Sequence, residues 1–174
     1  MNGEHLEVLL TREQISERVK ELAESISQNY EGKELLLICV LKGAVVFLAD
    51  LIRNLRIPTQ VDFIGASSYA GETSRGEVNL APLFSSSVHD KEVLIVEDII
   101  DSGLTYRALT NYLARLEPAN LRLCTLLNKP SQRRAELIKP DYVGFTIPDK
   151  FVVGYGLDYN ERYRELQDIC VLVT

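Results

Sequence analysis

Short apolar runs alternate with amphipathic segments along this chain, and the two patterns predict different elements. Residues 35–41 form an uninterrupted apolar run, which is typical of a parallel strand buried on both faces. Apolar residues spaced three or four positions apart predict helices instead. These patterns predict strands at 35–41, 61–66, 79–84, 92–96, 121–127, 142–147 and 170–173. They predict helices after Thr11, at 44–55 and at 105–116, and a short helical turn at 132–138.

The first helix has a sequence signal for its start. Thr11 and Gln14 have the spacing of a capping box, in which each side chain bonds the backbone N–H of the other residue. The apolar positions behind them fall on one helical face: Ile15, Val19, Leu22, Ala23 and Ile26. Because strands alternate with helices, we expect an α/β fold with a central, mostly parallel sheet of about five strands flanked by helices.

Composition narrows the class of protein. The chain has 174 residues and a formal net charge of -6, without a run of Lys and Arg, so we expect one domain and no nucleic-acid partner. It shows no signal peptide pattern and no apolar stretch long enough to span a membrane. Cys39, Cys124 and Cys170 each lie in an apolar run, which favours buried thiols in a reducing, cytoplasmic protein.

The most informative stretch covers residues 93–105. A predicted strand runs into Glu97 and Asp98, and Asp101 precedes a short polar turn and a helix. A turn at a helix N-terminus can bind a phosphate through its backbone N–H groups. Each piece alone is more typical of a helix cap or a solvated acid than of a ligand site. Acids beside a phosphate site indicate a ligand that also carries hydroxyls, a metal ion or a transferable proton.

The whole run resembles the phosphoribosyl diphosphate signature of type I phosphoribosyltransferases. The form Glu-Asp-Ile-Ile-Asp at residues 97–101 resembles the hypoxanthine-guanine branch. The resemblance extends from about residue 35 to residue 173 through several separate motifs. It implies the type I phosphoribosyltransferase fold, as a single domain over 1–174 with a small hood formed mainly by 148–174 and part of the N-terminus.

The same resemblance assigns roles within the signature. Glu97 and Asp98 would meet the ribose hydroxyls and Mg²⁺, and Asp101 would handle the proton on the base nitrogen that attacks. The cradle for the 5-phosphate would continue through Ser102, Gly103, Leu104 and Thr105. Many relatives have threonine in place of Ser102, and some have lysine in place of Leu104.

Two loops would meet the diphosphate. Lys42 and Gly43 follow the first buried strand, and in the family the Leu41–Lys42 peptide bond can be cis. Ser68 and Tyr69 begin a polar segment at 67–76, rich in small residues, which is typical either of an ordinary loop or of a lid that excludes water.

The remaining motifs concern the base and the metal ion. Lys129 matches the lysine that meets the 6-oxo group of the purine, Phe151 the aromatic that stacks on the base, and Val152 a backbone contact to its edge. Ile100 would pack near the base. Asp158 matches a carboxylate associated with Mg²⁺, and Arg164 matches the arginine that clamps diphosphate.

The resemblance therefore implies a glycosyltransferase of purine salvage, acting on phosphoribosyl diphosphate and a 6-oxopurine with Mg²⁺, as a homodimer or a homotetramer. The products would be IMP or GMP and diphosphate. One alternative is an enzyme for xanthine or another base. A second is a regulator of the same fold that senses phosphoribosyl diphosphate while binding RNA or DNA. The sequence leaves open the ranking of the bases and the choice between dimer and tetramer.

Overall fold

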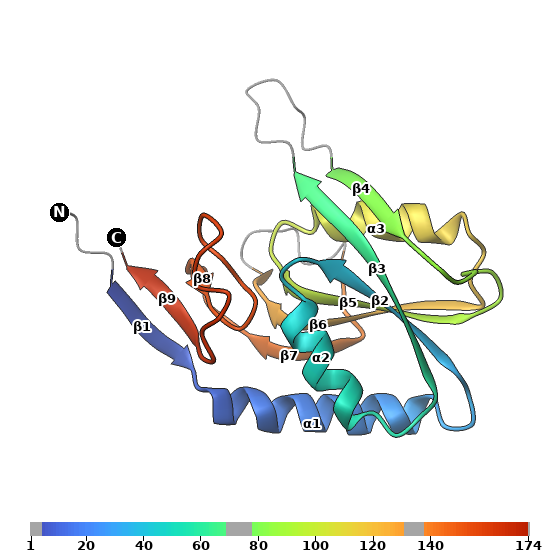
Figure 1. Ribbon diagram of the computed structural model, residues 1–174, viewed down its shortest axis with the longest axis horizontal. Coiled ribbons are helices and arrows are strands. Elements are labelled where there is room, and N and C mark those ends of the chain that lie inside the picture. Colours follow the sequence, from blue (N-terminus) through green and yellow to red (C-terminus); the bar gives the residue numbers. More distant parts are fainter. Residues whose placement is uncertain (1–4, 69–77, 131–137, 174) are drawn as a thin grey trace.

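A six-stranded sheet lies at the centre of the fold, in the order β4-β3-β2-β5-β6-β7 (Figure 1). The computed structural model describes residues 5–68, 78–130 and 138–173. The strands are β2 (Leu35–Leu41), β3 (Thr59–Ser68), β4 (Val78–Leu83), β5 (Glu92–Ile100), β6 (Asn120–Asn128) and β7 (Tyr142–Thr146). All neighbours pair in parallel except β4, which is antiparallel to β3 at one edge. The α/β prediction is confirmed, and the sheet is mixed, with the antiparallel β4 beside the five parallel strands.

Helices cover both faces of this sheet. Alternate residues of β2 belong to two separate cores, because successive side chains of a strand point to opposite faces. Leu35 and Leu37 pack with α1 (Arg12–Asn29) and α2 (Val45–Asn54), whereas Leu36 packs with α3 (Leu104–Ala114) on the other face.

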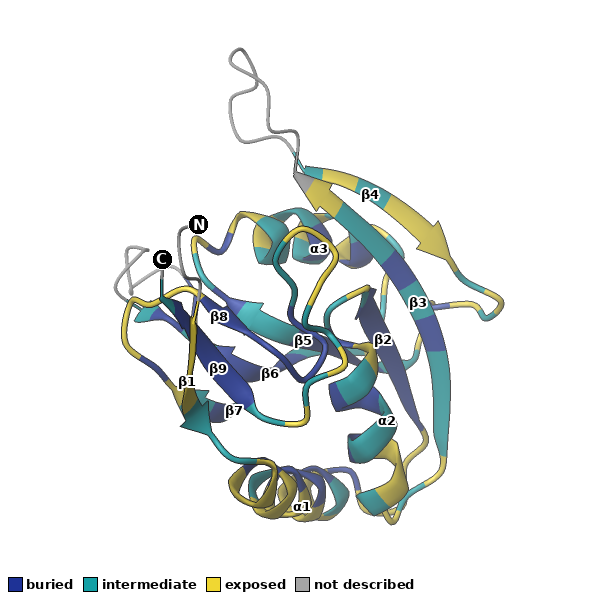
Figure 2. Ribbon diagram, turned by 60° about the vertical axis from the view of Figure 1, so that its left-hand side comes forward, coloured by how far each residue is buried: buried dark blue, intermediate teal, exposed yellow. Residues whose placement is uncertain are grey.

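A second, three-stranded sheet joins the two ends of the chain. It is antiparallel, in the order β1 (His5–Leu10), β9 (Ile169–Val173), β8 (Val152–Val153). Figure 2 shows β9 as a buried strand beside the largely exposed β1. Strand β1 was not predicted from the sequence: although its residues are largely apolar, the strand is short and pairs with β9 at the far end of the chain, a contact that leaves no local signal.

Strand β5 is longer than the hydrophobic pattern predicted. The prediction ended the strand at Val96, but pairing with β6 continues through Glu97↔Thr125 and on to Ile100↔Asn128. Glu97 and Asp98 therefore lie within β5, and Asp101 directly follows it. A strand is defined by its backbone pairing, which charged side chains do not interrupt when they face a cavity.

The three cysteines are free and buried, as the sequence predicted. Burial raises the pKa of the Cys39 thiol to about 12, with smaller contributions from Glu97 and Asp98. Within the parts of the chain that the structure describes, no helix is both long enough and apolar enough to cross a membrane. The helical turn predicted at 132–138 falls almost wholly outside the described residues.

The predicted capping box at the start of α1 is confirmed. Thr11 Oγ1 accepts from the Gln14 backbone N–H at 3.3 Å, and Gln14 Oε1 accepts from the Thr11 N–H at 2.9 Å. The predicted apolar positions are the buried residues of the helix.

Replacing Thr11 with alanine should therefore lower the free energy of unfolding by about 1 kcal/mol. For a chain of this size that loss lowers Tm by roughly 2–4 °C, which calorimetry can measure. Thr11→Ser keeps the hydroxyl and should stay close to wild type. Equal losses in the two variants would contradict a capping role for this hydroxyl.

Candidate active site

The turn after β2 lies against the acids of β5, because the two strands are parallel neighbours. Cys39 pairs with Val96, so Lys42 and Gly43 emerge at the edge where Glu97 and Asp98 lie. A Cβ at Gly43 would collide with the carboxylate of Asp98. Only glycine allows this approach without a shift of the acid or the turn. The Leu41–Lys42 peptide bond is cis, the isomer that the resemblance had left open.

A cavity of about 280 Å³ lies above this edge, at the N-terminus of α3. Many of the site residues predicted from the sequence line it, including those for the 5-phosphate and the ribose: Gly43, Glu97, Asp98, Ile100, Asp101, Ser102, Gly103 and Thr105. Leu104 does not line it, and its side chain is exposed. Tyr106 also lines it, although the sequence analysis did not select this residue, since an aromatic side chain in a helix is usually part of a core.

The start of α3 has the features of an anion site. Its N-cap is Gly103, at φ 81°, and no side chain caps the helix. The Leu104 N–H makes only a long contact of 3.4 Å with Ser102 Oγ. Backbone N–H groups at an uncapped helix start, together with the helix dipole, attract negative charge into this cavity.

The two acids of β5 carry an electrostatic cost. Burial is the main reason why the pKa of Glu97 lies well above its usual range, and the neighbouring Asp98 raises it further. Burial also raises the pKa of Asp98, while its hydrogen bonds, including one from the Ile99 N–H at 2.7 Å, act in the opposite direction. A ligand that brings hydroxyl donors or positive charge would relieve this cost.

A second cavity, of about 370 Å³, adjoins the first and shares Gly43, Asp98 and Asp101 with it. Its other predicted residues are Lys42, Lys129, Phe151, Val152, Asp158 and Arg164. The structure thus gathers residues from distant segments around one pair of connected cavities. Ile100 lines only the first cavity, while Ile99 lines both.

Lys129 is the buried cation of the second cavity. Its side chain is 8% exposed, and its ammonium lies 3.4 Å from Asp101 Oδ2 and 3.2 Å from Asp149 Oδ1. Sequence reasoning missed Asp149, because an acid in an irregular segment carries no periodic or motif signal.

Arg164 is tied to the loop around it. Its guanidinium donates to the Gly156 carbonyl at 2.8 Å and pairs with Asp158 at 3.0 Å and Glu161 at 3.4 Å. Lys42 lies 3.3 Å from the same Glu161 carboxylate. Glu161, another residue that the sequence analysis did not select, therefore lies between the two cations predicted for diphosphate.

The predicted metal ligands Glu97, Asp98 and Asp158 do not form a preformed metal-binding site. Among the described residues, no group of three or more His, Cys, Asp or Glu side chains is placed to hold a metal ion. Asp98 and Asp158 line the same cavity, whereas Glu97 lines only the neighbouring one. Mg²⁺ commonly binds through one or two carboxylates plus substrate phosphates and waters, so this donor set fits a metal that arrives with its substrate.

Two predicted residues cannot be placed in either cavity. Tyr69, with most of the expected lid, lies outside the described residues. Ser68 ends β3, which brings its backbone to the same edge of the sheet, but its side chain is not among those that the structure describes.

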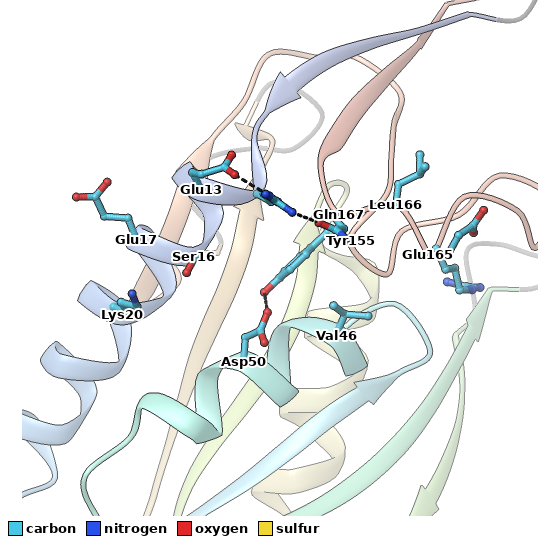
Figure 3. Close-up of a pocket in the computed structure, with 12 residues that line it drawn as sticks. Glu13, Ser16, Glu17, Lys20, Val46, Asp50, Tyr155, Glu165, Leu166 and Gln167 are labelled. Atoms are coloured by element: carbon cyan, nitrogen blue, oxygen red, sulfur yellow. Dashed lines mark hydrogen bonds and ion pairs between the residues drawn. The ribbon is translucent and has the colours of Figure 1, made fainter.

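A larger cavity, of about 870 Å³, lies elsewhere (Figure 3). It lies between α1, α2 and residues 155–167, where Tyr155 donates to Asp50 at 2.6 Å. Arg164 lines this cavity too, but Glu97, Asp98 and Asp101 do not. The chemistry gathered around the two smaller cavities, rather than size, identifies the candidate active site.

Similarity to known proteins shows the class of protein to which this chain belongs. The chain belongs to the phosphoribosyltransferase family: the family model described as a phosphoribosyl transferase domain matches residues 5–160.

The relatives narrow the family to one branch. The hypoxanthine-guanine phosphoribosyltransferase of Mycobacterium tuberculosis H37Rv is 49% identical, over 98% of this chain and 87% of its own length. That of Staphylococcus aureus N315 is 44% identical, over 99% of this chain and 96% of its own. A hypoxanthine-guanine phosphoribosyltransferase structure from Bacillus anthracis, with HEPES in its active site, has a TM-score of 0.91 at 43% identity, over 99% of this chain and 100% of that one. The resemblance and the fold predicted from the sequence are confirmed.

The raised pKa of Glu97 has a consequence for stability. A carboxyl group whose pKa is raised by folding stabilises the fold fully at low pH, and this contribution is lost as the pH rises through the raised value. Glu97→Gln removes the charge and should raise Tm at pH 8 by roughly 2–4 °C.

The gain from Glu97→Gln should shrink at pH 5, because the raised pKa of Glu97 increasingly favours its uncharged form as the pH falls. Glu31→Gln, at an exposed position, is the matched control and should change Tm little at either pH. A Tm difference between Glu97→Gln and wild type that does not depend on pH would show that burial does not disfavour the charged form.

Proposed function

We propose that this chain transfers the 5-phosphoribosyl group from phosphoribosyl diphosphate to hypoxanthine or guanine, giving IMP or GMP and diphosphate. The observation that supports this most directly is the pair of connected cavities, which have an anion site at one end, a buried lysine at the other and Asp101 between them. The relatives that bear this activity in their names align over nearly the whole chain.

The first cavity suits the ribose 5-phosphate. The phosphate would bind at the start of α3, through backbone N–H groups and the hydroxyls of Ser102 and Thr105. Glu97 and Asp98 would accept hydrogen bonds from the two ribose hydroxyls, which a carboxylate does readily. Ribose binding would thereby satisfy acids whose burial is otherwise unfavourable.

The second cavity suits a 6-oxopurine. Phe151 would stack on the base, the Val152 backbone would meet its edge, and Lys129 would donate to the 6-oxo group. In the reaction, the bond from the anomeric carbon to the base nitrogen forms as the bond to the diphosphate oxygen breaks. Asp101 lines both cavities and would take the proton released from the base, as a general base.

The diphosphate would leave towards Lys42, Gly43 and Arg164. Positive charge there offsets the charge that develops on the leaving group. Mg²⁺, when bound, would add electrostatic stabilisation of the diphosphate, and Asp98 and Asp158, with Glu97 nearby, are the residues that would hold it. Ser68 and Tyr69 stay predicted contacts of the closed site, and the cytoplasmic location stays a prediction.

We also propose that the chain is a single domain, with the three-stranded sheet as its hood, and that it assembles into a dimer or a tetramer. In the Trypanosoma cruzi enzyme, 40% identical, the C-terminal region has a role in the oligomeric state and enzymatic activity. Here the C-terminal residues 164–167 line the cavity beside α2, whose Val45 and Ile52 are exposed apolar side chains. Light scattering after gel filtration would give the number of copies.

Incubation with phosphoribosyl diphosphate, Mg²⁺ and one base at a time tests the function. We expect nucleotide formation, followed by absorbance, with hypoxanthine and guanine, little with adenine, and loss of activity on chelation of Mg²⁺ that added metal restores. Turnover with xanthine alone would favour the alternative enzyme. Binding of the sugar donor without turnover of any base would favour the sensing regulator.

Lys129 should set the preference for 6-oxopurines. An ammonium can only donate, so the amino group of adenine would place two donors face to face in a partly dry cavity. A bond left unmade there costs about 1–3 kcal/mol, which corresponds to roughly 5- to 150-fold in specificity. The amide of Lys129→Gln can accept a hydrogen bond as well as donate one. This variant should therefore lower kcat/KM for hypoxanthine and narrow the difference in kcat/KM between hypoxanthine and adenine.

The control for this variant is Lys139→Gln, which changes a lysine at an exposed position in the same way. An unchanged ratio of kcat/KM for hypoxanthine and adenine in Lys129→Gln would assign recognition of the base to backbone groups near Val152 instead.

A further inference from the structure

We infer that Asp149 is a positioning residue for base recognition, which holds Lys129 in the orientation that reads the 6-oxo group. The inference rests on the proposed function and adds to it a residue that no motif selects. Asp149 Oδ1 lies 3.2 Å from the Lys129 ammonium, closer than Asp101 Oδ2 at 3.4 Å. Lys129 and Asp101 are among the described residues that line the cavity, whereas Asp149 is not. Asp149 therefore acts through the lysine and not on the substrate.

The backbone holds both partners firmly. The Lys129 N–H donates to the Ile100 carbonyl at 2.9 Å, which fixes the end of β6 against β5. The Ile147 N–H donates to the Asn128 carbonyl at 3.0 Å, and the Lys150 N–H donates to the Pro148 carbonyl at 2.8 Å. Asp149 lies in the short turn closed by the second bond, so main-chain bonds hold its backbone beside the end of β6, within reach of the Lys129 ammonium.

Because the Lys129 ammonium is buried, a single carboxylate partner does not satisfy it. The Lys129 side chain is only 8% exposed, and an ammonium that has lost its water needs anionic or hydrogen-bonding partners. It has three N–H donors, which match Asp101, Asp149 and the 6-oxo group of a bound base. Without Asp149 the ammonium would turn towards Asp101, and the group that reads the base would pair with the group that takes the proton.

The reaction makes this second acid more important. When Asp101 accepts the proton from the base it becomes neutral, and Lys129 loses the attraction of one counter-ion. Asp149 does not line the cavity and takes no part in this transfer, so the ammonium keeps one carboxylate partner while it faces the 6-oxo group. Asp149 thus separates recognition of the base from transfer of the proton.

Steady-state kinetics of Asp149→Asn test the inference. We expect the KM for hypoxanthine to rise by about tenfold, while the KM for phosphoribosyl diphosphate stays within about twofold. Asp149→Glu keeps the charge and should recover most of the loss. Asp90→Asn, at an exposed acid before β5 with a φ of 58° that asparagine tolerates, is the control for the lost charge and should behave as wild type.

The deciding measurement is the double variant. If Asp149 acts through Lys129, then Asp149→Asn should cost almost nothing more once Lys129→Gln is present. A further tenfold rise in the double variant would overturn the inference, and so would an unchanged KM for hypoxanthine in the single variant or an equal rise in both KM values. If the wild type itself made no nucleotide, the proposed function would fail, and the inference would fall with it.

Discussion

The site depends on a close backbone approach that only glycine permits. A side chain at Gly43 would collide with the Asp98 carboxylate, and one at Gly156 would collide with the Gly43 carbonyl. Gly156 accepts in turn from Arg164 at 2.8 Å. These contacts join β5, the turn after β2 and the segment that leads from β8 to β9, so the central sheet and the small sheet meet at the same acids. A shift in any one of these pieces would move the cations relative to the acids.

The acids at this edge are arranged for ligand binding rather than for stability. Glu97 and Asp98 are adjacent, and burial raises the pKa of both. A fold selected for stability alone would place apolar residues there, since an unpaired buried charge is costly. Hydroxyl groups of a ligand, a metal ion and the positive end of the α3 dipole would supply the hydrogen bonds and positive charge that these acids lack. The preorganised charge is then available to the reacting groups without rearrangement of water.

Lys129 shows how one side chain can serve recognition while it touches the catalytic acid. It is bracketed by two carboxylates, and only Asp101 shares the cavity with it. The larger cavity beside α2 is not lined by an uncapped helix start or by the acids of β5. The chemistry of the lining, rather than its size, therefore distinguishes the candidate active site.

The sequence by itself determined the alternation of strands and helices, the capping box at Thr11 and the burial of the cysteines, because periodicity and caps are local signals. Its resemblance to a known family, carried by the run at 97–105 and the separate motifs around it, indicated most residues of both cavities. It could not show that β5 continues to Ile100, that β1 pairs with β9, or that Asp149 and Glu161 lie against the functional cations. Pairing of backbones and contacts between distant loops leave no periodic trace in a chain. Only the tertiary structure brings Lys129 and Asp149 together, because the loop after β7 must first fold back against the end of β6.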